Sequence, residues 1–256
     1  MTNIPTPPPY PDAHGLLAGK TVLVTAAAGT GIGFATARRC IEEGGQVAIS
    51  DIHERRLRES ADELGAHAVL ANVTSEDDVQ RLLSDVVETF GRLDVLVNNA
   101  GLGGTARLTE MTDDQWSAVL DVTLTGTMRM TRAALRHMCE RGSGVIVNNA
   151  SVVGWRAQEG QAHYAAAKAG VMALTRCAAV EAAPSGVRVN AVAPSLAMHP
   201  HLAKVTTDEL LAELTTREAF GRAAEPWEVA NVIVFLASDL ASYMTGEVVS
   251  VSSQHP

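Results

Sequence analysis

The chain has 256 residues, of which 46% are apolar and 19% are charged. This length and apolar fraction are enough to bury a large core, which excludes a chain that is disordered over most of its length. The formal net charge is −9, and no basic run is longer than the pair Arg55-Arg56. An acidic surface repels phosphodiester backbones, so we expect no nucleic-acid partner.

Cysteine usage and the first residues indicate the compartment. Cys40, Cys139 and Cys177 lie far apart in segments with helical patterns. An odd, scattered set fits neither a disulfide framework nor a metal site, so we expect free thiols in a reducing cytoplasm and no bound metal. Residues 1–14 are rich in proline and lack the charge and apolar pattern of a signal peptide, and no apolar run is long enough to span a membrane. We interpret residues 1–14 as an extended proline-rich arm and expect no membrane contact.

Residues 20–100 alternate short β-branched runs with helical patterns. Strands are predicted at 22–25, 46–50, 68–70 and 95–97, and helices at 35–43, 54–64 and 76–89. The strands are nearly continuous apolar runs, which is typical of parallel strands buried on both faces.

The second half repeats this alternation with longer helices. The pattern predicts helices at 113–138, 162–182 and 227–237, an amphipathic helical segment at 200–219, and strands at 145–147, 187–189 and 247–251. No linker composition separates the halves. The sequence therefore predicts one α/β domain over residues 15–256, a doubly wound seven-stranded parallel sheet with helices on both faces.

A glycine-rich turn follows the first strand, with the sequence Ala26-Ala27-Ala28-Gly29-Thr30-Gly31-Ile32-Gly33. Glycines admit a pyrophosphate, and the N–H groups that open the next helix attract its charge. Asp51 ends the second strand, 18 residues after Gly33, where a carboxylate accepts both ribose hydroxyls of adenosine. The same carboxylate repels a 2′-phosphate and Ile52 is uncharged, so we expect NAD to be the preferred cofactor over NADP. The positive charges of Arg55 and Arg56 argue against this preference.

Four motifs occur in a specific order: the glycine turn, Asn98-Asn99-Ala100-Gly101, Ser151, and Tyr164-Ala-Ala-Ala-Lys168. Each is modest alone, but together they make residues 18–251 resemble the short-chain dehydrogenase/reductase family. The resemblance implies a Rossmann-type sheet, a nicotinamide cofactor and a homo-oligomer, for which we expect a tetramer.

Tyr164 and Lys168 stand four apart on a helix, so their side chains project from one face. A phenol is a poor base at neutral pH, and a nearby ammonium together with the oxidised nicotinamide lowers its pKa. In the family, the lysine also holds the nicotinamide ribose. A serine at the position of Ser151 holds the substrate oxygen. We therefore expect Ser151, Tyr164 and Lys168 to be catalytic. Thr123 stands where the family has an asparagine that anchors a water relay, and we expect it to take over part of that role.

The resemblance also implies the cofactor contacts. Besides Tyr164 and Lys168, they are Thr30, Gly31, Ile32, Gly33, Asp51, Ile52, Asn72, Val73, Asn99, Ala100, Gly101, Pro194 and Leu196. Besides Thr123, the sequence departs from the family pattern around the cofactor contacts. Ala27 occupies the first glycine slot, or one residue is inserted after Thr25; Asn72 replaces the usual aspartate near adenine; and Ser195 replaces a glycine.

The substrate pocket is expected between 101–107, 154–160 and a covering segment at 195–219, with Leu102, Ser151, Trp155 and Met198 in its wall. Apolar walls favour a secondary alcohol on a hydrophobic skeleton over a sugar. Longer stretches resemble an actinobacterial subgroup that oxidises a ring alcohol on CoA-linked intermediates of steroid C/D-ring breakdown. Two alternatives stay open. A 3-oxoacyl-thioester reductase is opposed by Asp51, and a catalytically weak NAD-binding sensor or assembly partner is opposed by the intact Ser151, Tyr164 and Lys168.

Overall fold

The computed structural model describes residues 6–198 and 208–253. Seven parallel strands form one sheet in the order β3-β2-β1-β4-β5-β6-β7, which confirms the predicted fold class. The strands are β1 (Thr21–Thr25), β2 (Gln46–Asp51), β3 (His67–Leu70), β4 (Val95–Asn98), β5 (Gly144–Asn149), β6 (Val187–Pro194) and β7 (Val248–Val251). The order reverses between β1 and β4, and ligands of such sheets bind at the carboxyl ends beside this switch point.

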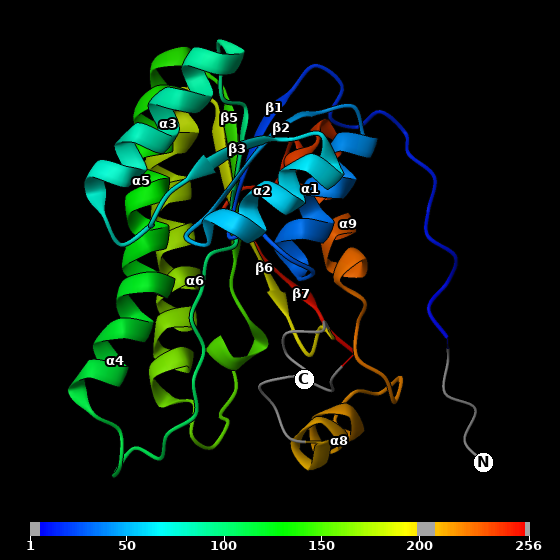
Figure 1. Ribbon diagram of the computed structural model, residues 1–256, viewed down its shortest axis with the longest axis vertical. Helices are drawn as coiled ribbons and strands as arrows, with labels where there is room; N and C mark the ends of the chain where they lie inside the picture. Colours follow the sequence, from blue (N-terminus) through cyan, green and yellow to red (C-terminus); the bar gives the residue numbers. More distant parts are fainter. Residues whose placement is uncertain (1–5, 199–207, 254–256) are drawn as a thin grey trace.

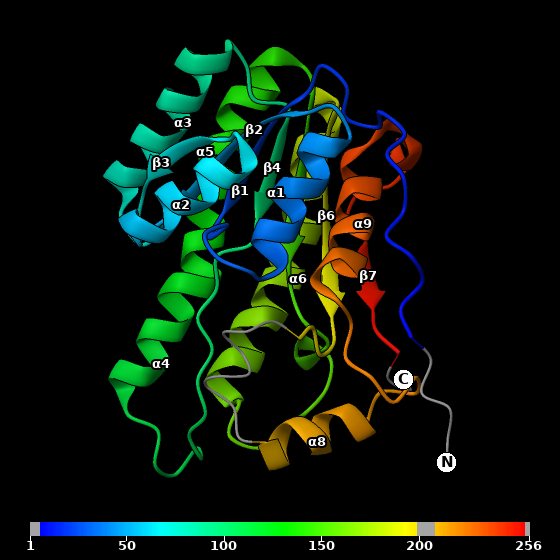
Figure 2. The same ribbon diagram turned by 45° about the vertical axis from the view of Figure 1, so that its right-hand side comes forward.

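Helices cover both faces of the sheet (Figure 1). They are α1 (Ile32–Glu42), α2 (Glu54–Leu64), α3 (Glu76–Phe90), α4 (Asp113–Leu120), α5 (Gly126–Arg141), α6 (Ala162–Ala182), α8 (Asp208–Thr216) and α9 (Pro226–Ala237). Helices α1, α2 and α9 lie on one face, and α3, α5 and α6 lie on the other. Helix α8 lies beyond the carboxyl ends of β6 and β7 (Figure 2).

Each face of the sheet has its own apolar core. Val22 and Val24 of β1 pack with residues of α1, α2 and α9, whereas Leu23 between them packs with residues of α3, α5 and α6. Successive side chains of a strand point to opposite faces, so a continuous apolar run is what a doubly covered strand requires.

The long helix predicted at 113–138 is interrupted, and this prediction was wrong in detail. A π-helical turn, η1 (Asp121–Thr125), separates α4 from α5. Two glycines make room for it: a Cβ at Gly126 would lie 2.7 Å from Val73, and one at Gly170 would lie 2.8 Å from Leu124. Helical periodicity does not reveal one extra residue in a turn, because the apolar face on either side keeps its spacing.

Other element bounds shift by a few residues. The strand predicted at 187–189 continues to Pro194, and the helical segment predicted at 200–219 contains α8 at Asp208–Thr216. Residues 199–207 of that prediction lie outside the described residues.

Residues 6–14 of the N-terminal arm lie alongside α1 and α9 (Figures 1 and 2). Its main anchor is the buried ion pair between Arg39 and Glu43, whose Nη2 and Oε1 atoms are 2.6 Å apart. Arg39 donates to the carbonyl oxygens of Pro11 and Asp12 at 2.8 Å each, and Glu43 accepts from two backbone N–H groups further along the arm. The ring of Tyr10 meets that of Trp227 edge-on, with centroids 5.4 Å apart.

Within residues 6–198 and 208–253, no helix combines the length and the apolar character needed to cross a bilayer. The same ranges contain no group of three or more His, Cys, Asp or Glu residues that could hold a metal ion.

Candidate active site

Ser151, Tyr164 and Lys168 come together at the carboxyl end of β5. Ser151 follows β5 and opens the short turn η2 (Val152–Gly154), and its hydroxyl forms a hydrogen bond with Tyr164. Lys168 lies one helical turn further along α6, with Nζ 5.5 Å from the centroid of the Tyr164 ring. Lys168 Nζ donates to the carbonyl oxygen of Asn149 at 2.5 Å. The structure thus places the three predicted catalytic side chains in one cluster.

Gly154 allows the turn after Ser151 to lie directly on α6. A Cβ at this position would be 2.8 Å from Met172 Cε and 3.0 Å from the backbone nitrogen of Ala169. Because 3.0 Å from backbone is tighter than almost all real Cβ contacts, a side chain here would press the turn after Ser151 away from the helix that bears Tyr164 and Lys168.

Burial dominates the electrostatics of the cluster. Burial raises the pKa of Tyr164 to about 12, although the hydrogen bond with Ser151 lowers it. Burial also lowers the pKa of Lys168 to about 8. The effect of Lys168 on the tyrosine that we expected from the sequence is therefore not seen in the protein alone. At neutral pH, Tyr164 is a protonated phenol, ready to donate a proton to a substrate oxygen.

Thr123 is fully buried in the π turn, close to the lysine. Its hydroxyl donates to the carbonyl oxygen of Leu102 at 3.2 Å and accepts from the Leu102 N–H at 3.0 Å. Its own carbonyl oxygen accepts from the Thr127 hydroxyl at 2.7 Å. These contacts favour a role in fixing the loop after β4, and a water relay through Thr123 stays a prediction.

The glycine turn has the shape of a phosphate cradle. Gly31 opens α1 without a capping side chain from the described part of the chain, which leaves the first N–H groups of the helix available. A Cβ at Gly33 would lie 2.4 Å from Asn99 Nδ2 and 2.5 Å from the Ala26 carbonyl oxygen. Gly29 has a φ of 105°, which side-chain-bearing residues rarely adopt. These residues fit the pyrophosphate of a dinucleotide.

Asp51 ends β2 beside this turn and is 8% exposed. Its carboxylate accepts from the N–H of His53 at 2.9 Å and from the N–H of Ala28 at 3.4 Å. Burial raises the pKa of Asp51 above its usual value, while the charge of Arg56 acts in the opposite direction. Arg55, the other cation noted in the sequence, pairs with Glu59 at 3.3 Å.

The remaining predicted cofactor residues line the same edge of the sheet. The hydroxyl oxygen of Thr25 accepts from the N–H groups of Asn99 and Ala100 at 3.0 and 3.1 Å. The Asn72 amide oxygen accepts from both the N–H and the hydroxyl of Thr74, so its expected contact with adenine would have to compete with these bonds. Val73 is buried, whereas Thr30, Ile52 and Gly101 are exposed.

The base of the covering segment is held by one buried carboxylate. Glu218 accepts from the Ser195 hydroxyl at 3.0 Å, from the Leu196 N–H at 3.3 Å and from the Ser253 hydroxyl at 2.8 Å. Met198 donates from its N–H to the Ala224 carbonyl oxygen at 2.9 Å. These bonds fix the backbone at two residues that we predicted in the site, Leu196 for the cofactor and Met198 for the substrate wall.

The other predicted wall residues, Leu102 and Trp155, lie on neighbouring loops and are exposed. The loops meet where the Ala106 N–H donates to the Gly160 carbonyl oxygen at 3.0 Å and Arg107 pairs with Glu159 at 2.9 Å. The two loops therefore form one edge of the expected pocket.

Sequence reasoning missed three residues of the site: Asn149, His163 and Glu218. His163 is buried next to Tyr164, and its Nδ1 accepts from the Tyr164 N–H at 2.9 Å. Its Nε2 would be 3.2 Å from a Cβ at Gly104, so a side chain there would press on it. A polar residue in the otherwise small and apolar stretch around Tyr164 was the available signal.

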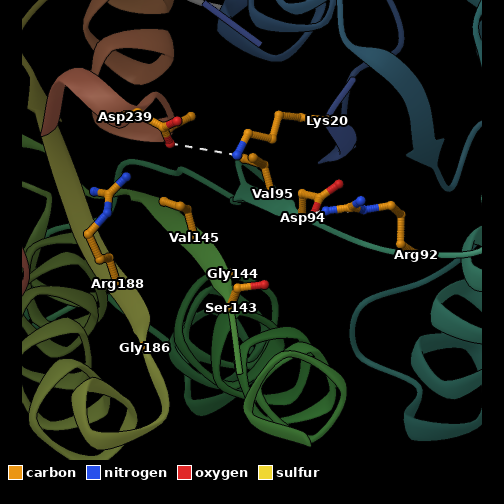
Figure 3. Close-up of a pocket in the computed structure, with 11 residues that line it drawn as sticks. Lys20, Arg92, Asp94, Val95, Ser143, Gly144, Val145, Gly186, Arg188 and Asp239 are labelled. Carbon is orange, nitrogen blue, oxygen red and sulfur yellow. Dashed lines mark hydrogen bonds and ion pairs between the residues drawn. The ribbon is translucent and has the colours of Figure 1, made fainter. Parts of the chain in front are cut away.

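A polar cavity of about 150 Å³ opens at the opposite, amino-terminal edge of the sheet (Figure 3). Lys20 and Asp239 face each other across it at 3.6 Å, and Arg92 pairs with Asp94 at 2.5 Å. Arg188 donates to carbonyl oxygens at the end of α9. These charged groups have partners within the fold, and the cavity is separate from the cluster around Tyr164.

Comparison with known proteins decides the family. A family model described as "Enoyl-(Acyl carrier protein) reductase" matches residues 26–253. The chain belongs to the short-chain dehydrogenase/reductase family. This confirms the resemblance seen in the sequence motifs, and it makes the protein an oxidoreductase of a family that uses NAD or NADP.

Among its relatives, a Mycobacterium tuberculosis protein is 61% identical over 99% of this chain and 100% of its own length. That protein is named (5R,7aS)-5-hydroxy-7a-methyl-1-oxo-2,3,5,6,7,7a-hexahydro-1H-indene-carboxyl-CoA reductase. A cis-4-hydroxycyclohexanecarboxylate dehydrogenase of Sinomonas cyclohexanicum is 44% identical over 91% of this chain and 95% of its own. The crystal structure of a short chain dehydrogenase from Mycobacterium smegmatis has a TM-score of 0.88 and 59% identity, covering 99% of this chain and 100% of its own.

Proposed function

We propose that the protein is an NAD-dependent oxidoreductase that transfers hydride between nicotinamide and a secondary alcohol or ketone on a hydrophobic, CoA-linked ring derived from a steroid. The observation that supports it most is the cluster of Ser151, Tyr164 and Lys168 next to a dinucleotide-binding turn. The names of the relatives support the substrate class, because both act on an oxygen carried by a carbocyclic ring.

The residues of the cluster divide the proton chemistry between them. The bound nicotinamide supplies or accepts the hydride. In reduction, the Tyr164 hydroxyl gives its proton to the substrate oxygen while the substrate carbon receives the hydride; in oxidation, both transfers reverse. Ser151 would hold the same oxygen beside Tyr164, and Lys168 would bind the nicotinamide ribose and favour the phenolate, as the family resemblance implies.

Asp51 supports NAD over NADP. The carboxylate is buried at the end of β2, where the adenosine ribose of such cofactors lies, and a 2′-phosphate there would meet its negative charge. The charge of Arg56 opposes this repulsion, while the carboxylate itself is tied to the turn by the hydrogen bond from the Ala28 N–H.

We also propose a homotetramer that works in the reducing cytoplasm. Helix α6 exposes the small residues Ala166 and Ala173 and, further along, Val180, which is 77% exposed. A row of small residues allows two helices to approach closely, as a symmetric interface requires. Ala133 and Ala134 of α5 are buried in the core and do not add to this exposed surface. The free thiols of Cys40, Cys139 and Cys177 suit a reducing compartment.

The test is an assay of cofactor reduction with three substrates at equal concentration. They are a CoA thioester of a hydroxylated bicyclic carboxylic acid, a linear 3-hydroxyacyl-CoA, and free 4-hydroxycyclohexanecarboxylate. We expect the highest kcat/KM with the bicyclic thioester and NAD⁺. A preference for the linear thioester with NADP⁺ would establish the 3-oxoacyl-thioester reductase instead. Tight NADH binding without turnover of any substrate would favour the sensor or assembly partner.

A further inference from the structure

Asn149, the last residue of β5, contacts both halves of the site. Its carbonyl oxygen accepts from Lys168 Nζ at 2.5 Å, and its side-chain Nδ2 donates to the Oδ1 of Asn99 at 3.0 Å. The first contact is made by the backbone and does not depend on the side chain. The second does, and it leads toward the phosphate-binding turn.

Asn99 holds the first part of that turn. Its Nδ2 donates to the carbonyl oxygens of Thr25 at 3.1 Å and Ala26 at 3.0 Å. Ala26 has a φ of 50°, a left-handed conformation that is uncommon for alanine and needs support from its surroundings. Gly33 completes the arrangement, because only the absence of a Cβ leaves room for this amide.

The amide of Asn99 works in one orientation only. If it turned over, its Oδ1 would face two carbonyl oxygens, and the turn would lose both donated hydrogen bonds. The donor from Asn149 meets Oδ1 and thereby selects the orientation in which Nδ2 faces Thr25 and Ala26. An aliphatic side chain at position 149 would remove this donor, and the carbonyl oxygens of Thr25 and Ala26 alone would then hold the amide in its working orientation.

The stability of the fold does not explain why an asparagine stands at position 149. Its own Oδ1 is buried and has no hydrogen-bond partner within residues 6–198 and 208–253. A buried polar atom without a partner costs free energy, and an apolar side chain of the same size avoids that cost. The side chain therefore makes one useful contact, the bond to Asn99.

We propose that Asn149 is a positioning residue for the cofactor: it fixes the amide of Asn99, which in turn holds the strained start of the phosphate-binding turn. This inference rests on the nicotinamide cofactor of the proposed function. Asn149 acts on the affinity for the cofactor and leaves the proton chemistry of Tyr164 unchanged.

The experiment compares Asn149→Leu with the unchanged protein in three measurements: the Kd for NADH by fluorescence titration, the melting temperature without cofactor, and kcat at saturating NADH. We expect the Kd to rise about tenfold, the scale of one lost ordering contact. The melting temperature should stay the same or rise, and kcat should change less than about twofold.

The matched control is Asn190→Leu. Asn190 is another asparagine of the sheet and is fully buried, but its amide donates to the Met244 carbonyl oxygen and accepts from the Glu247 N–H, away from the turn. It should show the opposite pattern, a lower melting temperature with an unchanged Kd for NADH. If Asn149→Leu does not fold, the smaller Asn149→Ser is measured against the same criteria.

A double-mutant cycle tests the route through Asn99. In an Asn99→Ala background, Asn149→Leu should change the Kd less than about twofold, because the contact it removes no longer exists. An equal effect in both backgrounds would overturn the proposal, as would a lower melting temperature with an unchanged Kd. Failure of the unchanged protein to bind NADH or NADPH would contradict the proposed function, which is a separate result.

Discussion

The cofactor side and the substrate side of the site are built differently. On the cofactor side, polar side chains such as Asn99, Thr25 and Asp51 hydrogen-bond to backbone groups of neighbouring strands and the turn. On the substrate side, apolar residues such as Leu102 and Trp155 are exposed on loops. The difference teaches that cofactor geometry is fixed by the sheet itself, whereas the substrate wall can change without disturbing the fold. Substitutions on the two sides should therefore alter different measured constants.

The largest effect should come from the residue at the boundary between the two sides. Tyr164→Phe removes the proton donor and changes little else, so kcat should fall about 10²–10⁴-fold, the usual contribution of a general acid. The Kd for NADH should stay the same. Single-turnover measurements and NADH titration provide the check, and a variant that keeps most of its activity would assign the proton to another group.

Lys168→Met should lower activity about 100-fold through loss of the charge near Tyr164. The same change should raise stability at pH 7. Burial lowers the pKa of Lys168 to about 8 from 10.5, so the folded chain binds fewer protons than the unfolded chain between these values. The buried charge of Lys168 therefore destabilises the folded state by its full amount below about pH 8, and by less and less as the pH rises toward 10.5.

We expect the gain from Lys168→Met to be about 1–3 kcal/mol at pH 7 and to shrink at pH 10. Thermal unfolding at both pH values measures it. A variant that is less stable at pH 7 would mean that the hydrogen bond to the Asn149 carbonyl outweighs the cost of burying the charge.

Asp51→Ala should change cofactor binding without changing the substrate wall. Without the carboxylate, NAD⁺ loses its ribose contact and NADP⁺ no longer meets a negative charge next to Arg56. The ratio of the two Kd values should shift at least about tenfold toward NADP⁺, equivalent to about 1.4 kcal/mol. Titration with both cofactors is the measurement, and Arg55→Ala, which removes a cation already paired with Glu59, is the control.

The smallest effect is expected from Glu218→Gln, which sharpens the comparison on the substrate side. Glutamine keeps one carbonyl oxygen but cannot accept all three of the present hydrogen bonds as a carboxylate does. The KM for the alcohol should rise about threefold, because the base of the covering segment loses part of the free energy of one hydrogen bond. An unchanged KM together with a weaker Kd for NADH would place Glu218 on the cofactor side.

Local patterns were enough to predict the sheet, and the family motif was enough to predict that Tyr164 and Lys168 share one helix. The strands are continuous apolar runs and the two predicted catalytic residues lie four apart on α6, so neither prediction depends on a distant partner. The π turn at Thr123 depends on glycines 126 and 170 meeting side chains from elsewhere in the chain. Asn149 and Glu218 act through partners that are 50 and 23 residues away, respectively. Such contacts follow from the packed fold and leave no periodic signal in the sequence.

The ion pair of Arg39 and Glu43 has a practical consequence for anyone who shortens or tags the amino terminus. The pair is buried, and it satisfies its remaining hydrogen-bonding capacity with backbone groups of residues 11–16. A chain that begins after Leu16 would expose both charges on α1 to rehydration and let the last turn of that helix fray. Removing residues 1–16 would thus weaken the helix whose other end follows the glycine turn, and we expect a chain cut this way to lose cofactor on dilution sooner than the 256-residue chain.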